Sequence, residues 1–207
     1  MSTRGCVARL TSKEDKPVKF VGTYLHWDNY PDGTGASLFA LRNGKFKGNT
    51  DAMLKLLIDE HPAGWSTING VDWSLPIGYK ENDFKNYNPD APKPPQCFCH
   101  GDRSEKAFEV TEENSCEVGC EYAYAFTPDG KTMVVLSSHY VSDNGEKRKM
   151  IGMFGCGDPD ATWEPIGIVD LDGDEPDWEL MGLNEEQIVE IMTGRKPESN
   201  EAAVEVS

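Results

Sequence analysis

The sequence predicts an α+β fold: one domain with an antiparallel sheet, built as a meander of hairpins, and two or three short helices. Two observations carry this prediction. Some segments alternate apolar and polar residues with the period of two that is typical of half-buried strands. These segments are 6–10, 18–25 and 121–126, and the apolar run 133–136 is expected to return as a strand after the turn that follows 126. The segment that begins at Thr50 spaces its apolar residues as an amphipathic helix does, and a short helix is expected before it, from about Ser37.

The first half of the chain is expected to hold one hairpin followed by two helices. Glu14-Asp15-Lys16-Pro17 provides turn residues between the first two strands. The second helix begins at Thr50, a residue type that caps helix N-termini, and Pro62 and Gly64 end it. Its buried face is formed by Met53, Leu54, Leu57 and Ile58. Residues 69–95 are rich in Pro and aromatic residues, which predicts an irregular excursion from the domain.

The second half of the chain is expected to continue the meander. Pro128-Asp129-Gly130 and Ser142-Asp143-Asn144-Gly145 are hairpin signals, and 149–154 and 165–169 are further strands. A terminal helix begins at Asn184, with Gln187 as its capping-box partner. The domain is therefore expected to span 1–195. The polar composition of residues 196–207 predicts a disordered acidic tail.

The charge of the chain is strongly acidic and unevenly distributed. The formal net charge is -16, and 13 of these excess negative charges lie in residues 157–207. Such a field repels phosphates, so direct binding of nucleic acid is not expected, whereas a basic host protein would be attracted. No run of eighteen apolar residues predicts a membrane span, and the N-terminus does not resemble a secretory signal. A cytoplasmic location, in the host cell, is the expectation.

Residues 26–35 form the most informative segment, because they place titratable, aromatic and glycine residues between a predicted strand and a predicted helix. A loop in this position can present backbone N–H groups to an anion or another ligand. The candidate ligand-binding residues are His26, Trp27, Asp28, Tyr30, Asp32, Gly33, Thr34 and Gly35. If the protein is an enzyme, His26 is the candidate acid or base and Asp28 orients its ring. The alternative is a structural corner with no ligand.

The cysteines suggest a metal site. Cys97-Phe98-Cys99-His100 and Cys116-Glu117-Val118-Gly119-Cys120 are two groups of ligand-type residues separated by a loop. Thiolates combined with imidazole favour zinc, and four protein ligands favour a structural site. The candidate ligands are Cys97, Cys99, His100, Cys116 and Cys120. The alternative is a set of buried thiols with no metal.

His26-Trp27-Asp28-Asn29-Tyr30-Pro31 resembles the His-Trp-Asp-Gly-Tyr-Pro stretch of an uncharacterised group of proteins from bacteriophages and actinobacteria. Cys97-Phe98-Cys99-His100-Gly101-Asp102 and Glu121-Tyr122-Ala123-Tyr124 are similar to later blocks of that group. The resemblance covers 21–38 and 97–126, and Asn29 departs from the group's Gly. It implies a small accessory protein of a phage, and it assigns no activity or catalytic residue.

Three functions compete on these observations. The first is a non-enzymatic binding protein that receives a small molecule or a protein ligand at 26–35 and contains a structural zinc cluster. The second is an acidic inhibitor that occupies a basic groove on a host protein. The third is a hydrolase or transferase that uses His26 and Asp28, and it lacks a second recognisable catalytic group.

Overall fold

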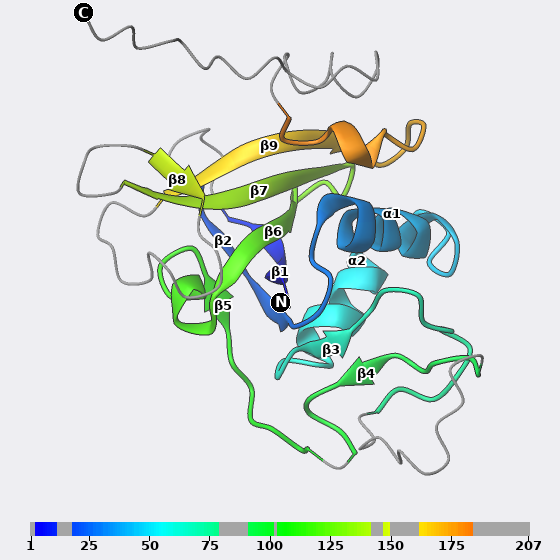
Figure 1. Ribbon diagram of the computed structural model, residues 1–207. Coiled ribbons are helices and arrows are strands. Elements are labelled where there is room, and N and C mark those ends of the chain that lie inside the picture. The colour runs from blue at the N-terminus through cyan, green and yellow to red at the C-terminus, as the bar shows by residue number, and fades with distance from the viewer. Residues whose placement is uncertain are drawn as a thin grey trace, which may run out of the picture.

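In the described part of the chain, nine strands form one mixed sheet at the centre of the protein (Figure 1). The computed structural model describes residues 3–11, 18–78, 91–101, 103–141, 147–149 and 162–183. The strands run in the order β4-β3-β2-β1-β6-β7-β8, with β5 paired to β2 and β9 paired to β7. Their bounds are β1 Arg4–Leu10, β2 Phe20–Leu25, β3 Trp65–Thr67, β4 Gln96–Cys97, β5 Val110–Thr111, β6 Cys120–Phe126, β7 Thr132–Val141, β8 Lys147–Lys149 and β9 Thr162–Asp170.

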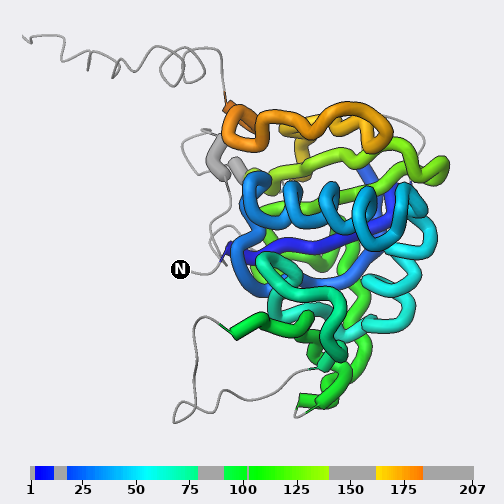
Figure 2. The backbone as a smooth tube through the Cα atoms, turned by 90° about the vertical axis from the view of Figure 1, so that its right-hand side faces the viewer, coloured from blue at the N-terminus to red at the C-terminus, as the bar shows by residue number. Residues whose placement is uncertain are grey.

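The helices lie between β2 and β3 in the sequence and pack together on one side of the sheet (Figure 2). A π-helical turn η1 (Pro31–Gly35) leads into α1 (Ala36–Asn43), and α2 (Thr50–Leu54) continues into the π-helical turn η2 (Lys55–Asp59). Two 3-10 turns, η3 (Ser115–Val118) and η4 (Trp178–Leu180), precede β6 and follow β9. Among the described residues, no helix is long and apolar enough to cross a bilayer.

Apolar side chains fill both sides of the sheet. On the helix side, Leu38, Met53 and Leu57 pack against Trp65 and Tyr124 of the strands, and all five are fully buried. Burying side chains of this size contributes about 1.5 to 3 kcal/mol each. The other side has a smaller cluster of buried residues, namely Cys6, Ala8, Phe20, Val110, Cys120, Ala123, Ala125 and Leu136. This two-sided packing accounts for an α+β domain with the sheet at its centre.

The α+β class and the single domain are confirmed, whereas the purely antiparallel meander is wrong. The pairs β1–β6 and β2–β3 are parallel. Alternation of apolar and polar residues identifies a strand, but it does not identify its neighbour. The segment between Leu10 and Cys120 contains β2 to β5 and both helices, and after this long connection β6 lies beside β1 in the same direction.

Where the structure describes them, the individual strands and helices agree closely with those expected from the sequence. The first two strands, the hairpin β6–β7 and strand β9 are present, and α1 begins at Ala36. Asn49, not Thr50, caps α2: its side chain accepts a hydrogen bond from the N–H of Ala52. Thr50 is instead buried, and its hydroxyl donates to the carbonyl of Gly130. The predicted turn at 142–145, the helix from 184, the tail 196–207 and part of the excursion, 79–90, lie outside the described residues.

Candidate metal centre

Two short segments meet at the edge of the sheet and bring four potential metal ligands together. His61 lies in the turn between η2 and β3, and Cys97 ends β4. Because β4 pairs with β3, Cys97 lies opposite Trp65, and the N–H of Phe98 donates to the carbonyl of Gly64 at 2.9 Å. These backbone contacts place the segment 97–100 against the His61 turn.

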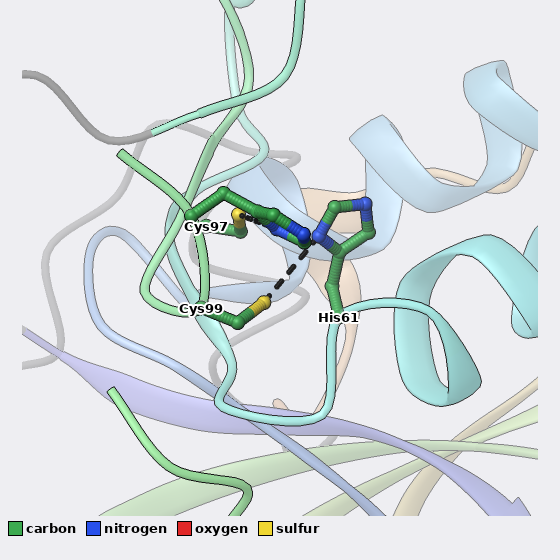
Figure 3. Close-up of side chains that lie close together, drawn as sticks. His61, Cys97 and Cys99 are labelled. Carbon is green, nitrogen blue, oxygen red and sulfur yellow. Dashed lines mark hydrogen bonds between the residues drawn. The ribbon is translucent and has the colours of Figure 1, made fainter. Parts of the chain in front are cut away.

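The four ligand atoms are close enough to share one ion. The atoms that His61, Cys97, Cys99 and His100 offer all lie within 4.8 Å of one another. The Cys99 sulfur lies 3.5 Å from Nδ1 of His61 (Figure 3). The Cys97 sulfur lies 3.2 Å from Nδ1 of His100. A tetrahedral zinc ion, with bonds of about 2.3 Å to sulfur and about 2.0 Å to nitrogen, separates its ligand atoms by about 3.3 to 3.8 Å. The cluster can therefore hold a metal ion after small side-chain adjustments.

The protonation of the cluster is set by burial. Cys97 and His61 are buried, Cys99 is half-buried and His100 is exposed. Burial, reinforced by the neighbouring Cys99, raises the pKa of the Cys97 thiol to about 11. Burial and then the neighbouring His100 lower the pKa of His61. A neutral imidazole is already in the form that binds metal, whereas the Cys97 thiol must lose its proton when the ion binds.

The structure corrects part of the ligand set expected from the sequence. Cys97, Cys99 and His100 are brought together as expected, but His61 completes the group instead of Cys116 and Cys120. Cys120 is fully buried on the other side of the sheet beside Cys6, and its thiol donates to the carbonyl of Gly5 at 3.3 Å. Cys116 lies in η3, just before β6. Spacing alone could not identify His61, because it stands 36 positions before Cys97 and only the β3–β4 pairing brings the two together.

The second half of the loop 26–35 is a structural corner and not an anion cradle. The N–H groups of Gly33 and Thr34 both donate to the carbonyl of Tyr30, so the turn itself uses them. Asn29 is fully buried, and its amide donates to the carbonyls of Thr3 and Leu25 while its oxygen accepts from the Thr34 hydroxyl. Gly35 packs against Trp178, which would lie 2.7 Å from an added Cβ. The glycines here allow close packing and do not expose the backbone to a ligand.

The other candidate residues of the loop are exposed or half-buried. Trp27 and Tyr30 are large aromatic residues that remain 47% and 49% exposed, and Asp28 and Asp32 are also exposed. Asp28 adopts a left-handed backbone with φ of 55°, which is rare for a residue other than Gly. The side-chain amide of Asn69 holds this conformation by donating to the Asp28 carbonyl at 2.8 Å, and the Thr34 hydroxyl lies 3.2 Å from the same oxygen.

The partner of His26 is a tyrosine. The hydroxyl of Tyr24 lies 2.7 Å from Nδ1 of His26, in the place that the catalytic hypothesis gave to Asp28. Burial, followed by Arg4 and Arg103, lowers the pKa of His26, so the imidazole is neutral at neutral pH. A neutral phenol orients the ring but does not stabilise an imidazolium as a carboxylate does. The geometry therefore gives little support to His26 and Asp28 as a catalytic pair.

No protein-family model, curated protein or solved structure matches this chain.

Proposed function

We propose that the protein is a non-enzymatic binding protein whose fold is completed by a structural zinc ion held by His61, Cys97, Cys99 and His100. One observation carries the proposal: two sulfur and two nitrogen ligands, from segments far apart in the sequence, converge within 4.8 Å. Two thiolates and two imidazoles are a ligand set typical of tetrahedral zinc. Four protein ligands leave no open position for a reacting water, which favours a structural role.

The local architecture supports the need for a metal cross-link. Strands β3 and β4 have only three and two residues, so their pairing contributes few backbone hydrogen bonds. The chain from Arg103 to Glu109 that follows forms no helix or strand, and Glu105 contacts Phe98 by a backbone hydrogen bond of 2.7 Å. An ion bound at the ligand cluster would fasten this irregular segment to the turn that contains His61.

Metal analysis of the purified protein tests the proposal. Expression in medium with zinc, followed by extensive dialysis and elemental analysis, should give about one zinc per chain. His61→Ala and Cys99→Ser should each lower the zinc content and the melting temperature. Cys116→Ser is the matched control, because it removes a thiol that the structure places outside the ligand cluster. Its zinc content should equal that of the parent.

Two results would contradict the proposal. The first is a folded parent protein that gives no stoichiometric metal and no thermal shift on addition of zinc. The second is equal loss of zinc in Cys116→Ser and Cys99→Ser, which would restore the ligand set expected from the sequence. X-ray absorption at the zinc edge should show two sulfur and two nitrogen neighbours, which separates this site from an adventitious surface ion.

The uneven charge supports a second candidate, an acidic inhibitor of a host protein. The structure restricts the residues that can serve it, because several acids of 170–179 have structural partners. Asp172 pairs with the buried Arg42 at 2.8 Å, and Glu175 accepts a hydrogen bond from the Trp178 indole. A deletion from 157 would remove β9, which pairs with β7 along its whole length. The informative deletion begins after Leu183: it should abolish inhibition without lowering the melting temperature by more than a few degrees.

A further inference from the structure

Two arginines and three aromatic rings gather around His26, beside the metal-ligand cluster. We call this surface the Trp27 face, and it consists of Arg4, Tyr24, His26, Trp27, Phe98 and Arg103. The β1–β2 register pairs Gly5 with Leu25, so Arg4 and His26 are neighbours at the next position. The face therefore combines β1, the end of β2, the loop after it and the segment after β4.

Ring contacts hold the face together. The imidazole of His26 meets the Trp27 indole edge to face at 4.7 Å between centroids. Phe98 is buried beneath them, 6.2 Å from His26 and stacked on Tyr24 at 6.3 Å. The guanidinium of Arg103 lies over the Phe98 ring, 4.8 Å from its centroid. Trp27 nevertheless remains half exposed, next to the left-handed Asp28.

The polar groups of the Trp27 face are mainly hydrogen-bond donors. Burial raises the pKa of Tyr24 to about 12, and the pKa of His26 is lowered, so both side chains are neutral at neutral pH. We assign the Tyr24 hydroxyl as donor to Nδ1 of His26, because a phenol is a better donor than acceptor and an imidazole nitrogen accepts well. This assignment puts the His26 proton on Nε2. With the two guanidiniums and the indole N–H, the face offers donors to an acceptor-rich partner.

We propose that the Trp27 face docks an acidic segment of a partner protein. Carboxylates of the partner would pair with Arg4 and Arg103, and an apolar side chain would cover Trp27. Two features support this occupant: Trp and Arg are the residues enriched in binding hot spots, with Trp27 47% exposed, and the two guanidiniums complement the charge of an acidic segment. The proposal goes beyond the zinc site and does not require the ion to be zinc.

A protein segment fits this surface better than a small molecule. A small ligand usually buries most of its surface in a concave pocket. The structure has a polar hollow of about 320 Å³ elsewhere, lined by Arg42, Thr50, Asp129 and Lys131, but its arginine is already paired with Asp172. Trp27 is instead half exposed at the protein surface. A partner that supplies its own apolar surface can cover such an exposed ring, as happens with aromatic anchors in protein interfaces.

The negative charge of the remaining chain does not prevent this docking. At about 0.15 M salt the Debye length is about 8 Å, so repulsion from distant carboxylates is screened while direct contacts with the arginines persist. The exposed Asp28, which follows Trp27, is one nearby carboxylate. Glu105 is another: its carboxylate lies 3.3 Å from Arg103 and competes with an incoming acid. Removing that carboxylate should strengthen binding, which gives the proposal a test in the opposite direction.

Fluorescence anisotropy with a labelled peptide, Glu-Glu-Glu-Leu-Glu-Glu-Glu, tests the proposal in 0.15 M salt. Combined Arg4→Gln and Arg103→Gln should raise Kd at least tenfold, which corresponds to about 1.4 kcal/mol. Lys131→Gln removes an exposed cation from the β6–β7 turn and should leave Kd unchanged. Trp27→Ala should weaken binding, whereas Ile168→Ala, at a residue 74% exposed on β9, should not. Glu105→Gln should lower Kd.

Three results would overturn the proposal. No peptide binding at millimolar concentration overturns the proposal, and so does an equal effect of Lys131→Gln and the arginine pair. Displacement of the peptide by adenosine monophosphate that binds more tightly would assign the face to a small anion instead and would also overturn it. Near-ultraviolet circular dichroism of each variant shows whether the fold survives. Zinc content, measured on the same samples, keeps a failure of the metal site distinct from a failure of this surface.

Discussion

Replacing Asn29 by Ala should destabilise the fold by about 2 to 4 kcal/mol. The side chain of Asn29 is fully buried and takes part in three hydrogen bonds, with the carbonyls of Thr3 and Leu25 and the hydroxyl of Thr34. Each buried partner left without a hydrogen bond costs about 1 to 3 kcal/mol. The sum stays near the lower end, because the Thr3 carbonyl also accepts from the Asn29 backbone, and the Thr34 hydroxyl also lies 3.2 Å from the Asp28 carbonyl.

Asn29→Asp separates hydrogen bonding from shape. This substitution keeps the size of the side chain but replaces the donor amide by a second acceptor, which would face two backbone carbonyls. It should destabilise at least as much as Asn29→Ala at pH 7. Because burial beside carbonyls raises the pKa of the introduced carboxyl in the folded state, the penalty should shrink as the pH falls.

Urea unfolding followed by tryptophan fluorescence measures both variants. A typical domain has a total stability of about 5 to 15 kcal/mol, so the expected loss moves the midpoint substantially without changing the slope. A loss below 1 kcal/mol for Asn29→Ala would refute the interpretation of 26–35 as a corner fixed by this side chain. So would greater stability of Asn29→Asp than of Asn29→Ala at pH 7.

Three further perturbations follow from the structure. Gly64→Ala should lower both stability and zinc content, because Gly64 has φ of +90° and a Cβ would approach the Tyr24 carbonyl to 2.6 Å, and melting temperature with metal analysis checks this. Arg42→Met should cost about 2 to 4 kcal/mol in urea unfolding, since it leaves the buried Leu171 carbonyl and Asp172 without their guanidinium partner. The low pKa of His26 makes the folded state bind its proton less readily than the unfolded chain, so stability should fall as the pH drops below about 6.5. His26→Asn should reduce that slope, and an unchanged slope would show that other groups cause the acid sensitivity.

The local sequence pattern predicts where strands and helices lie, but it does not predict which strands pair with one another. The hairpin β6–β7 could be predicted because its two strands and its Pro128-Asp129-Gly130 turn are contiguous in the chain. The parallel pairing of β1 with β6 joins segments more than a hundred residues apart, and alternation of side chains contains no information about it. The same limit applies to α2, where Asn49 and Thr50 are both good caps and only the packing of Thr50 against Gly130 decides between them.

The same distinction between local sequence and long-range pairing applies to the candidate metal ligands. Cys97, Cys99 and His100 are adjacent in the sequence, and the structure keeps them together. Cys116 and Cys120 have comparable sequence spacing, but β6 begins at Cys120 and its strand direction turns that thiol to the opposite side of the sheet. His61 replaces them because β3 begins four residues later and pairs with β4. Ligands that lie next to two paired strands are brought together by the register of that pairing. The spacing of residues in the sequence does not reveal this register.

The candidate metal-ligand cluster and the Trp27 face are linked through one residue. Phe98 stands between the ligands Cys97 and Cys99, yet its ring lies against Tyr24 and His26 and beneath the guanidinium of Arg103. An ion that fixes the two sulfurs must also limit the movement of the residue between them. Arg103 lies over Phe98, so the position of its charge depends on the same restraint. A structural ion at this edge would therefore act on function indirectly, by reducing the entropy lost when a partner binds.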